Sequence, residues 1–447
     1  MLRGRSGGPG NTSVRGPPRL ALIGQTVVHV QHLRLQDLSS RRTRLSNPVV
    51  RRPISGDSRR PVVHIGVRSV AFDRPRGGLE RAAGVHVRML RELGIRVCVH
   101  STPRAEPGPD GVVFRDVRWP VSFAGPGRPG FGLSYWVWAV SLARSLESCW
   151  TPGDIAHLHG AAVAALTRVR NTEISRRSVS NPHGMEEFQA GTVWQETNRR
   201  VVRGMSKRGA QAVAKIISTD NAMNEAIKRN LGVDDSKLVV VPNTVQSVLA
   251  DQALVDADTR STGSEPPAIV TVGRMVANKG YDNLARALLA LEDRGFFTRR
   301  MAWSHFGSGP AEATVSKMMS GSRKVSFSVV HGADDESVSS ALRSCRIFVQ
   351  PSRYEGSSLT TLEAMAQGTN VVATPVGGIP DKILDGQTGV LAADTSWQAL
   401  EDAVARGLAL DDNTLGRAAR MLVASSFTHK RAMEQYAELY DALEVEM

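Results

Sequence analysis

The segment from Gln350 to Leu359 (QPSRYEGSSL) combines a strand, a glycine loop and the start of a helix. Gly356 allows a ligand to approach the backbone, and Ser357 or Ser358 can cap the helix that follows. The amino end of a helix presents unpaired N–H groups and a positive partial charge, which suits a diphosphate. The amides around Ser357–Leu359 are therefore a candidate diphosphate site.

Two glutamates flank this helix start. Glu355 lies in the loop, and Glu363 follows eight residues later, about one turn into the helix. Both carboxylates can therefore face the same cleft. Because carboxylates repel an anionic ligand, we expect them to bind hydroxyl groups, which ribose and hexose supply.

A second motif, Gly273-Arg-Met-Val-Ala-Asn-Lys-Gly280, lies between a predicted strand and a predicted helix. Arg274 and Lys279 would bring two positive charges to the carboxyl edge of a sheet, where they can neutralise a leaving diphosphate. A metal ion supplies that charge in other proteins. The Asp-x-Asp spacing typical of a metal site occurs as Asp256-Ala-Asp258, and we interpret it as a solvated loop. We therefore expect neither a metal nor another cofactor.

Strands and helices alternate in two halves of the chain. A short apolar run at 62–67, the Gly77-Gly78 turn, a helical pattern and a strand at 95–99 form a first βαβ unit. Later strands are expected at 154–159, 178–181, 215–219 and 238–241 in the first half, and at 268–272, 301–306, 325–330, 346–350 and 370–373 in the second. This alternation predicts an α/β protein with two doubly wound, Rossmann-like domains that face each other across a cleft.

The domain boundaries follow from composition. We expect a basic extension at 1–60, a first domain at 61–245, a linker at 246–267 and a second domain at 268–425. A terminal helix at 426–447, with apolar residues at steps of three and four, is expected to return toward the first domain.

The positive charge is concentrated in the extension. Residues 1–60 hold twelve Arg against Asp37 and Asp57, which accounts for +10 of the net charge of +13. Such a block is typically disordered, although it superficially resembles an organelle transit peptide and could also be an over-extended translation start. We do not expect nucleic-acid binding. No run approaches the ~20 apolar residues that cross a bilayer, so a cytoplasmic protein is expected, with peripheral contact at the inner face of the membrane left open.

Three cysteines and two neighbouring histidines are further candidate metal ligands. Cys98, Cys149 and Cys345 lie far apart without paired spacing, which predicts neither a disulfide framework nor a zinc site. His157 and His159 face one side of a strand, and two such ligands without a third predict a structural role. The aromatic cluster Tyr135–Trp138 is expected in the core, with a docking face as the alternative.

Together these motifs resemble the retaining, GT-B-fold glycosyltransferases of group 1, also called family 4. The resemblance extends from about residue 62 to the end of the chain and covers the Gly-Arg…Lys-Gly motif and the glutamate pair. It implies that Glu355 contacts the donor sugar and Glu363 the ribose. It also implies that Arg274 and Lys279 bind the diphosphate of a nucleotide-diphosphate sugar.

Three further segments carry the same resemblance. Gly77-Gly78 is implied to be the first domain's glycine loop, and His183, in Asn181-Pro-His-Gly-Met, to lie beside the transferred sugar. Pro242-Asn-Thr244 is similar to the family's hinge segment, and Phe427 to Tyr440 to its returning helix. Thr244 replaces a customary glycine. Ser357-Ser358 and Thr360-Thr361 replace bulkier residues, and we expect these replacements to alter how the sugar hydroxyls are recognised.

The expected function is therefore metal-independent transfer of a sugar from a nucleotide-diphosphate donor, with retention of configuration. The acceptor stays open among a glycan, a lipid-linked sugar and a small molecule such as an inositol phosphate. Two alternatives remain at this stage: a nucleotide-sugar epimerase or hydrolase of the same fold, and a non-catalytic protein that acts through its basic arm.

Overall fold

The computed structural model describes residues 61–70, 72, 78–103, 108–120, 130–188, 193–245, 268–410 and 413–445. All of them belong to one compact unit. The expected extension, the expected linker and Gly77 lie outside the described residues.

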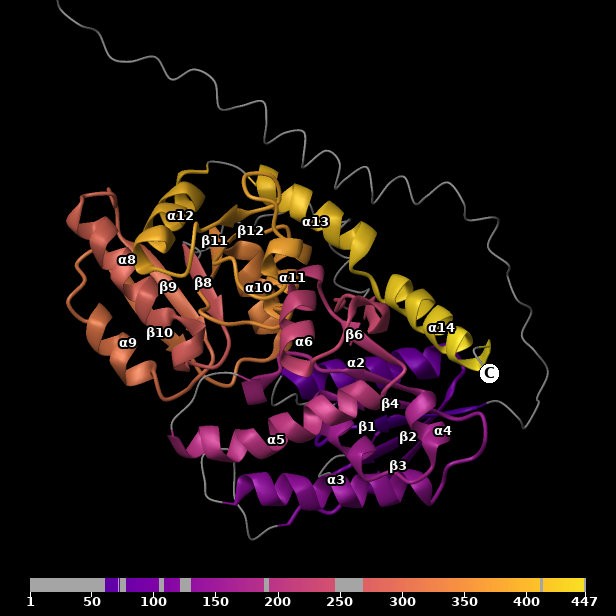
Figure 1. Cartoon of the computed structure of the whole chain (residues 1–447). Helices are drawn as coiled ribbons and strands as arrows, with labels where there is room; N and C mark the ends of the chain where they lie inside the picture. Colours follow the sequence, from indigo (N-terminus) through magenta and orange to yellow (C-terminus); the bar gives the residue numbers. More distant parts are fainter. Residues whose placement is uncertain are drawn as a thin grey trace, which may run out of the picture. The chain divides into compact units, whose positions relative to one another are not determined.

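The first half, coloured from indigo to magenta in Figure 1, is built on a parallel sheet. Its seven strands lie in the order β3-β2-β1-β4-β5-β6-β7. Its strands are β1 (Val62–Gly66), β2 (Arg96–Ser101), β3 (Val112–Asp116), β4 (Ile155–His159), β5 (Ser178–Asn181), β6 (Lys215–Ser218) and β7 (Leu238–Val240). The chain winds outward from β1 in both directions, so the loops after β1 and β4 lie beside the point where the winding reverses. In open α/β sheets, ligands bind at that point.

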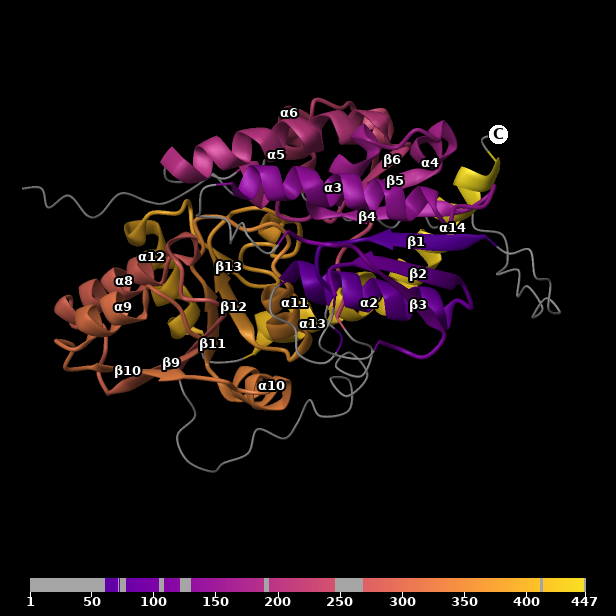
Figure 2. The ribbon, with the colours of Figure 1, turned by 90° about the horizontal axis from the view of Figure 1, so that it is seen from below.

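Helices cover both faces of this sheet, as Figure 2 shows. One apolar core joins the sheet to α3, α5 and α6, and the other joins it to α2 and α14. The helices of this half are α2 (Gly78–Glu92), α3 (Phe131–Glu147), α4 (Thr172–Arg176), α5 (Val193–Ala212) and α6 (Asn224–Leu231).

The second half forms a parallel sheet of six strands in the order β10-β9-β8-β11-β12-β13. Its strands are β8 (Ile269–Val272), β9 (Met301–Phe306), β10 (Val325–Val330), β11 (Ile347–Gln350), β12 (Asn370–Ala373) and β13 (Val390–Leu391). Its helices are α8 (Tyr281–Asp293), α9 (Glu312–Met319), α10 (Asp335–Ser344), α11 (Leu359–Ala366), α12 (Trp397–Ala409) and α13 (Thr414–Ser426). Two further apolar cores lie on its two faces.

The last helix, α14 (His429–Val445), leaves the second half and packs on the first. Tyr436, Leu439 and Leu443 lie in the same core as Ile65 of β1. The segments that lead out of each half also meet, because Val245 N donates to Phe427 O at 3.2 Å.

The aromatic cluster lies in α3. Trp138 is fully buried and Tyr135 is 8% exposed, so the prediction of a core position is confirmed for both, whereas Trp136 is 37% exposed. No helix within the described ranges is long and apolar enough to cross a membrane.

Candidate functional site

Lys279 and Glu355 meet where β8 and β11 end. Lys279 Nζ donates to Glu355 Oε1 at 2.6 Å, and the same oxygen accepts hydrogen bonds from Ser352 Oγ at 2.7 Å and Gln350 Nε2 at 2.9 Å. Glu355 is 9% exposed and therefore buried and fixed. The two loops that the sequence singles out thus form one site.

Arg353 holds these loops against each other. Its guanidinium makes a two-pronged ion pair with Asp282, with both N···O distances at 2.7 Å, and its backbone N donates to Asn278 O at 2.8 Å. Arg353 lowers the pKa of Asp282, which therefore stays charged. A side chain at Gly280 (φ 68°) would also collide with Pro351 O. This close packing fixes the position of Lys279.

Arg274 lies in the same loop but points to solvent. Its side chain is exposed and has no carboxylate partner among the described residues. The preceding Gly273 has a φ of 135°, a conformation that favours glycine. Arg274 is therefore the one cation of the predicted pair that is available for an anion from solution.

The start of α11 follows Glu355 and Gly356 directly. Ser358 caps the helix by accepting a hydrogen bond from Thr361 N at 3.3 Å, as its position before the helix predicts. Ser357 is half-buried before it, and Leu359 opens the helix. The first-turn amides have no partner within the helix, so they can bind an anion beside Lys279.

Glu363 belongs to a second charged group. Arg81 of α2 pairs with it, with Nη1 and Oε1 3.0 Å apart, and lies 3.7 Å from Asp335 of α10. Burial raises the pKa of Glu363, and Arg81 opposes that rise. A pocket opens here, and residues of both halves line it: Arg81, His86, Asn243, Leu359, Glu363 and Tyr436, among others. The pocket includes neither Arg274 nor Lys279.

The loop after β5 brings the backbone of His183 and Gly184 against Gly356. A Cβ atom on Gly356 would lie 2.8 Å from Gly184 Cα, so the two backbones touch. Tyr354 Oη also donates to Gly184 O at 2.5 Å. His183 has a φ of 51°, in the sparsely populated left-handed region, and Asn181 Oδ1 supports the turn by accepting from its backbone N.

A buried network of imidazoles supports His183. His183 Nε2 lies 2.8 Å from His159 Nδ1, whose other nitrogen lies 3.1 Å from His86 Nδ1. The hydroxyl of Tyr440 in α14 then contacts His86 Nε2 at 3.0 Å and His157 Nδ1 at 2.7 Å. The sequence predicts a pair of histidines on β4, His157 and His159, and the structure places His86 of α2 beside them. These contacts make the cluster a hydrogen-bonded support for His183.

Burial keeps these histidines neutral. It lowers the pKa of His183 to about 4 and that of His86 to about 3, and it holds the pKa values of His157 and His159 well below 6.5. His183 Nδ1 has no hydrogen-bond partner among the described residues, so it is available to a ligand. A neutral imidazole is therefore presented near Gly356.

Tyr440→Phe should lower the free energy of unfolding by about 1–3 kcal/mol, because two buried imidazole nitrogens lose their partner. Urea denaturation measures this loss. Arg431→Ala, at an exposed position of the same helix, should change the stability by less than about 0.5 kcal/mol. Equal stability of Tyr440→Phe and the parent chain would contradict the network.

Acid should destabilise the protein through the same histidines. Their pKa values are lower in the folded chain than the usual 6.5, so the unfolded chain binds more protons between pH 6.5 and about 4. Stability therefore falls as the pH falls, by about 1.4 kcal/mol per pH unit for each such histidine. His183→Asn removes one of these histidines, so the slope of the unfolding free energy with pH should fall by about 1.4 kcal/mol per pH unit. Urea denaturation at successive pH values measures this slope. An unchanged slope would contradict the assignment.

Of the glycine pair, only Gly78 is described. It opens α2, and a Cβ atom there would meet nothing within 4 Å. Its backbone is therefore accessible, whereas the role of Gly77 stays a prediction.

Sequence reasoning missed a buried ion pair between the two halves. Lys382 Nζ contacts Asp220 Oδ1, and both side chains are at most 1% exposed. Burial raises the pKa of Asp220, which the lysine charge opposes. Nothing in the sequence indicates that Asp220 and Lys382, which lie far apart in the chain, pair with each other. Breaking such a pair leaves an uncompensated buried charge.

Two parallel sheets, each covered by helices and with the charged site at their carboxyl edges, define a protein of two Rossmann-like domains. Residues 266–409 match the family model described as glycosyl transferases group 1, and residues 76–247 match the one described as Glycosyltransferase Family 4. These matches cover more than half of the chain. The chain belongs to the group 1, or family 4, glycosyltransferases.

Similar proteins agree with this family. A D-inositol 3-phosphate glycosyltransferase of Actinosynnema mirum is 32% identical over 239 residues, which are 50% of this chain and 57% of the relative. The chain spans between 38% and 60% of the length of the curated relatives that it matches first.

Solved structures show the GT-B fold. Sucrose-phosphate synthase from Thermosynechococcus elongatus superposes with a TM-score of 0.66 at 20% identity, over 86% of this chain and 99% of that one. An E. coli trehalose-6-phosphate protein bound with UDP-2-fluoro glucose superposes with a TM-score of 0.63 at 13% identity, over 86% and 99%.

Proposed function

We propose that this protein transfers a sugar from a nucleotide-diphosphate donor to a hydroxyl acceptor. The observation that carries the proposal is the Lys279–Glu355 pair beside the capped start of α11. One cation, one carboxylate and the amides at the start of the helix match the charges and hydroxyls of such a donor. The structure with UDP-2-fluoro glucose supports this class of donor for the fold.

The diphosphate would lie between Arg274, Lys279 and the first-turn amides of α11. When the bond between the anomeric carbon and the phosphate oxygen breaks, the diphosphate takes the bonding electrons and gains negative charge. The two cations and the amides stabilise that charge, and we propose that they do so without a metal.

The sugar would then lie between Glu355 and His183. Glu355 uses its Oε1 for three intramolecular contacts, so its second oxygen is the candidate acceptor for a sugar hydroxyl. His183 offers its Nδ1 from the opposite side. The resemblance to retaining enzymes supports attack by the acceptor hydroxyl on the face that the diphosphate leaves.

Glu363 would bind the ribose hydroxyls. Arg81 now occupies one of its oxygens, so donor binding at this position would have to share or displace that ion pair. The acceptor is a glycan, a lipid-linked sugar or a small molecule, and the pocket beside Glu363 is one place where it could bind.

Product analysis tests this proposal. Purified protein is incubated with ¹⁴C-labelled UDP-, GDP- and ADP-sugars, each with and without a panel of hydroxyl acceptors. The expected result is an acceptor-dependent labelled glycoside whose anomeric configuration, measured by NMR, matches that of the donor. Free sugar or an isomerised donor in every reaction, with no labelled glycoside, would contradict transfer and favour the hydrolase or epimerase alternative.

A further inference from the structure

Two imidazoles and two thiols meet on one buried face of the first sheet. His64 of β1 and Cys98 of β2 are paired in register, and His100 lies two residues further along β2, on the same face. Cys149, two residues after α3, approaches them from the helix layer. All four ligand atoms lie within 4.8 Å of one another.

Four distances among these atoms are close to the edges of a tetrahedral zinc site. With Zn–S bonds of about 2.3 Å and Zn–N bonds of about 2.0–2.1 Å, the edges are about 3.3 Å between nitrogens, about 3.6 Å between nitrogen and sulfur and about 3.8 Å between sulfurs. His64 Nδ1 and His100 Nε2 are 3.0 Å apart, and Cys98 Sγ is 3.5 Å from His100 Nε2. Cys149 Sγ lies 3.8 Å from His64 Nδ1 and 4.0 Å from His100 Nε2.

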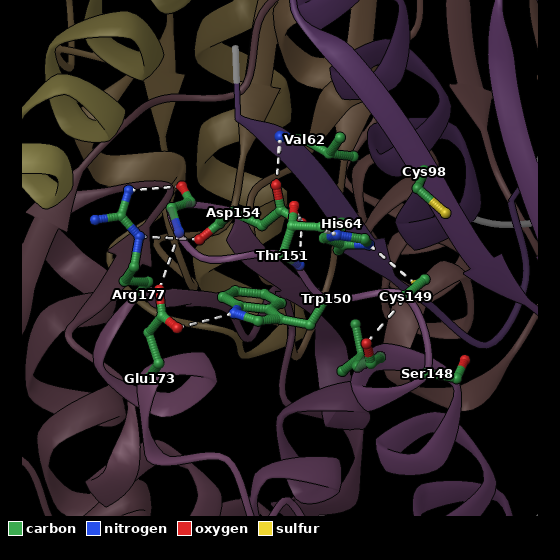
Figure 3. Close-up of polar contacts among 12 residues, drawn as sticks. Val62, His64, Cys98, Ser148, Cys149, Trp150, Thr151, Asp154, Glu173 and Arg177 are labelled. Atoms are coloured by element: carbon green, nitrogen blue, oxygen red, sulfur yellow. Dashed lines mark hydrogen bonds and ion pairs between the residues drawn. The ribbon is translucent and has the colours of Figure 1, made fainter. Parts of the chain in front are cut away.

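The second ring nitrogen of each imidazole also has a hydrogen-bond partner. His64 Nε2 contacts Asp154 Oδ2 at 3.0 Å, and His100 Nδ1 contacts Ser145 Oγ at 2.8 Å. The carboxylate of Asp154 is itself fixed by the backbone amides of Val62 and Thr151, both at 2.8 Å (Figure 3). Metal-binding histidines typically use their second nitrogen in this way, because the contact fixes the tautomer and the ring orientation.

We infer that His64, Cys98, His100 and Cys149 together bind one structural zinc-class metal ion. Four protein ligands complete a tetrahedral site, so the ion would have no open position for substrate. None of the four is a donor-site residue, and this inference does not rest on the proposed function. Tetrahedral sites with two sulfur and two nitrogen ligands select zinc among the common divalent ions.

The burial of the group favours a metal over an isolated polar cluster. His64, Cys98 and His100 are at most 5% exposed, beside an otherwise apolar core. Cys149 is half-buried, which leaves a route for the ion. Two other states could pair these buried polar groups without a metal. One is a hydrogen-bonded chain from Ser145 through both imidazoles to Asp154, and the other is a Cys98–Cys149 disulfide. The experiment below distinguishes all three states.

The first measurement is metal content. Untagged full-length protein, expressed in zinc-supplemented medium and dialysed, is analysed by mass spectrometry of the elements, and about one zinc per chain is expected. X-ray absorption at the zinc edge should show two sulfur and two nitrogen neighbours. This readout needs no variant and therefore stays decisive if ligand substitutions prevent folding.

Substitutions then test the ligands. Cys98→Ser and Cys149→Ser should each reduce bound zinc at least about tenfold, whereas Cys345→Ala, which removes the remaining cysteine, should leave it unchanged. Co²⁺ reconstitution of the parent chain should give a thiolate charge-transfer band that both serine variants lose. Chelator should also lower the melting temperature of the parent chain.

Thiol titration in denaturant with chelator identifies the alternative states. Three reactive thiols together with bound zinc support the inference, since the sequence has three cysteines. One reactive thiol would show a disulfide and overturn it. Three thiols without retained zinc, or zinc coordinated only by oxygen and nitrogen, would also overturn it.

Discussion

Replacing Arg274 and Lys279 together with alanine is expected to lower kcat by at least about 10³-fold, because each removes charge stabilisation of about 3 kcal/mol from the leaving diphosphate. The loss should appear in kcat more than in KM, since the negative charge on the diphosphate grows as the bond breaks. Single-turnover rates with the donor identified by product analysis measure the effect directly.

Two variants control this experiment. Arg343→Ala removes an exposed cation that pairs with Glu336 in α10, away from the loop, and should leave kcat unchanged. Lys279→Ala alone also deprives the buried Glu355 of its ion-pair partner, so its melting temperature must be compared with that of Arg274→Ala. Normal turnover in a folded double variant would contradict the role of both cations.

Gly356→Ala is expected to lower kcat by about 10²-fold or more. The new methyl group would lie 2.8 Å from Gly184 Cα and 3.2 Å from Gly184 N, so one backbone segment must move. A shift of about 1 Å between reacting groups can cost that factor, and here it would separate Glu355 from His183. Steady-state kinetics with saturating donor measure the loss.

Gly321→Ala is the matched control. A Cβ atom at Gly321 would meet nothing within 4 Å, and we expect wild-type kcat. The interpretation requires that Gly356→Ala stays folded, which its circular dichroism spectrum checks. A folded Gly356→Ala protein with full activity would show that the contact with Gly184 does not matter for turnover.

Most strands could be predicted because each is a short apolar run between turn residues. The expected strands at 178–181, 301–306, 325–330 and 370–373 agree with the structure to the residue. Two of the four edge strands, β3 and β13, were missed for a physical reason. β3 is largely exposed and β13 has two residues, so neither leaves a buried apolar run in the sequence.

The parts of the candidate donor site that are formed by neighbouring residues in the sequence could be predicted. Glu355, Gly356 and Ser358 form one motif, and the pairing of Lys279 with Glu355 follows from two loops at one sheet edge. Arg81 gave no such signal, because an arginine on a helix is usually solvated and its partner Glu363 is far along the chain.

The sequence spacing of the cysteines predicted neither a disulfide framework nor a zinc site, and it gave no sign that two of them lie close together in the fold. Cys98 and Cys149 lie 51 positions apart in sequence, yet β2 and the end of α3 place their sulfurs within 4.8 Å. Zinc motifs are recognised in a sequence by the short spacing between their ligands. The four residues proposed here come from two strands and a helix end, so they show no such spacing. Only the fold brings these ligands together.

Isothermal titration calorimetry with UDP-, GDP- and ADP-sugars tests most directly whether the loops after β8 and β11 hold an activated sugar. The account predicts saturable heat with at least one of these compounds, and a dissociation constant that rises at least about tenfold in Arg274→Ala. Absence of heat with every compound, from protein whose folded state is confirmed by circular dichroism, would contradict it.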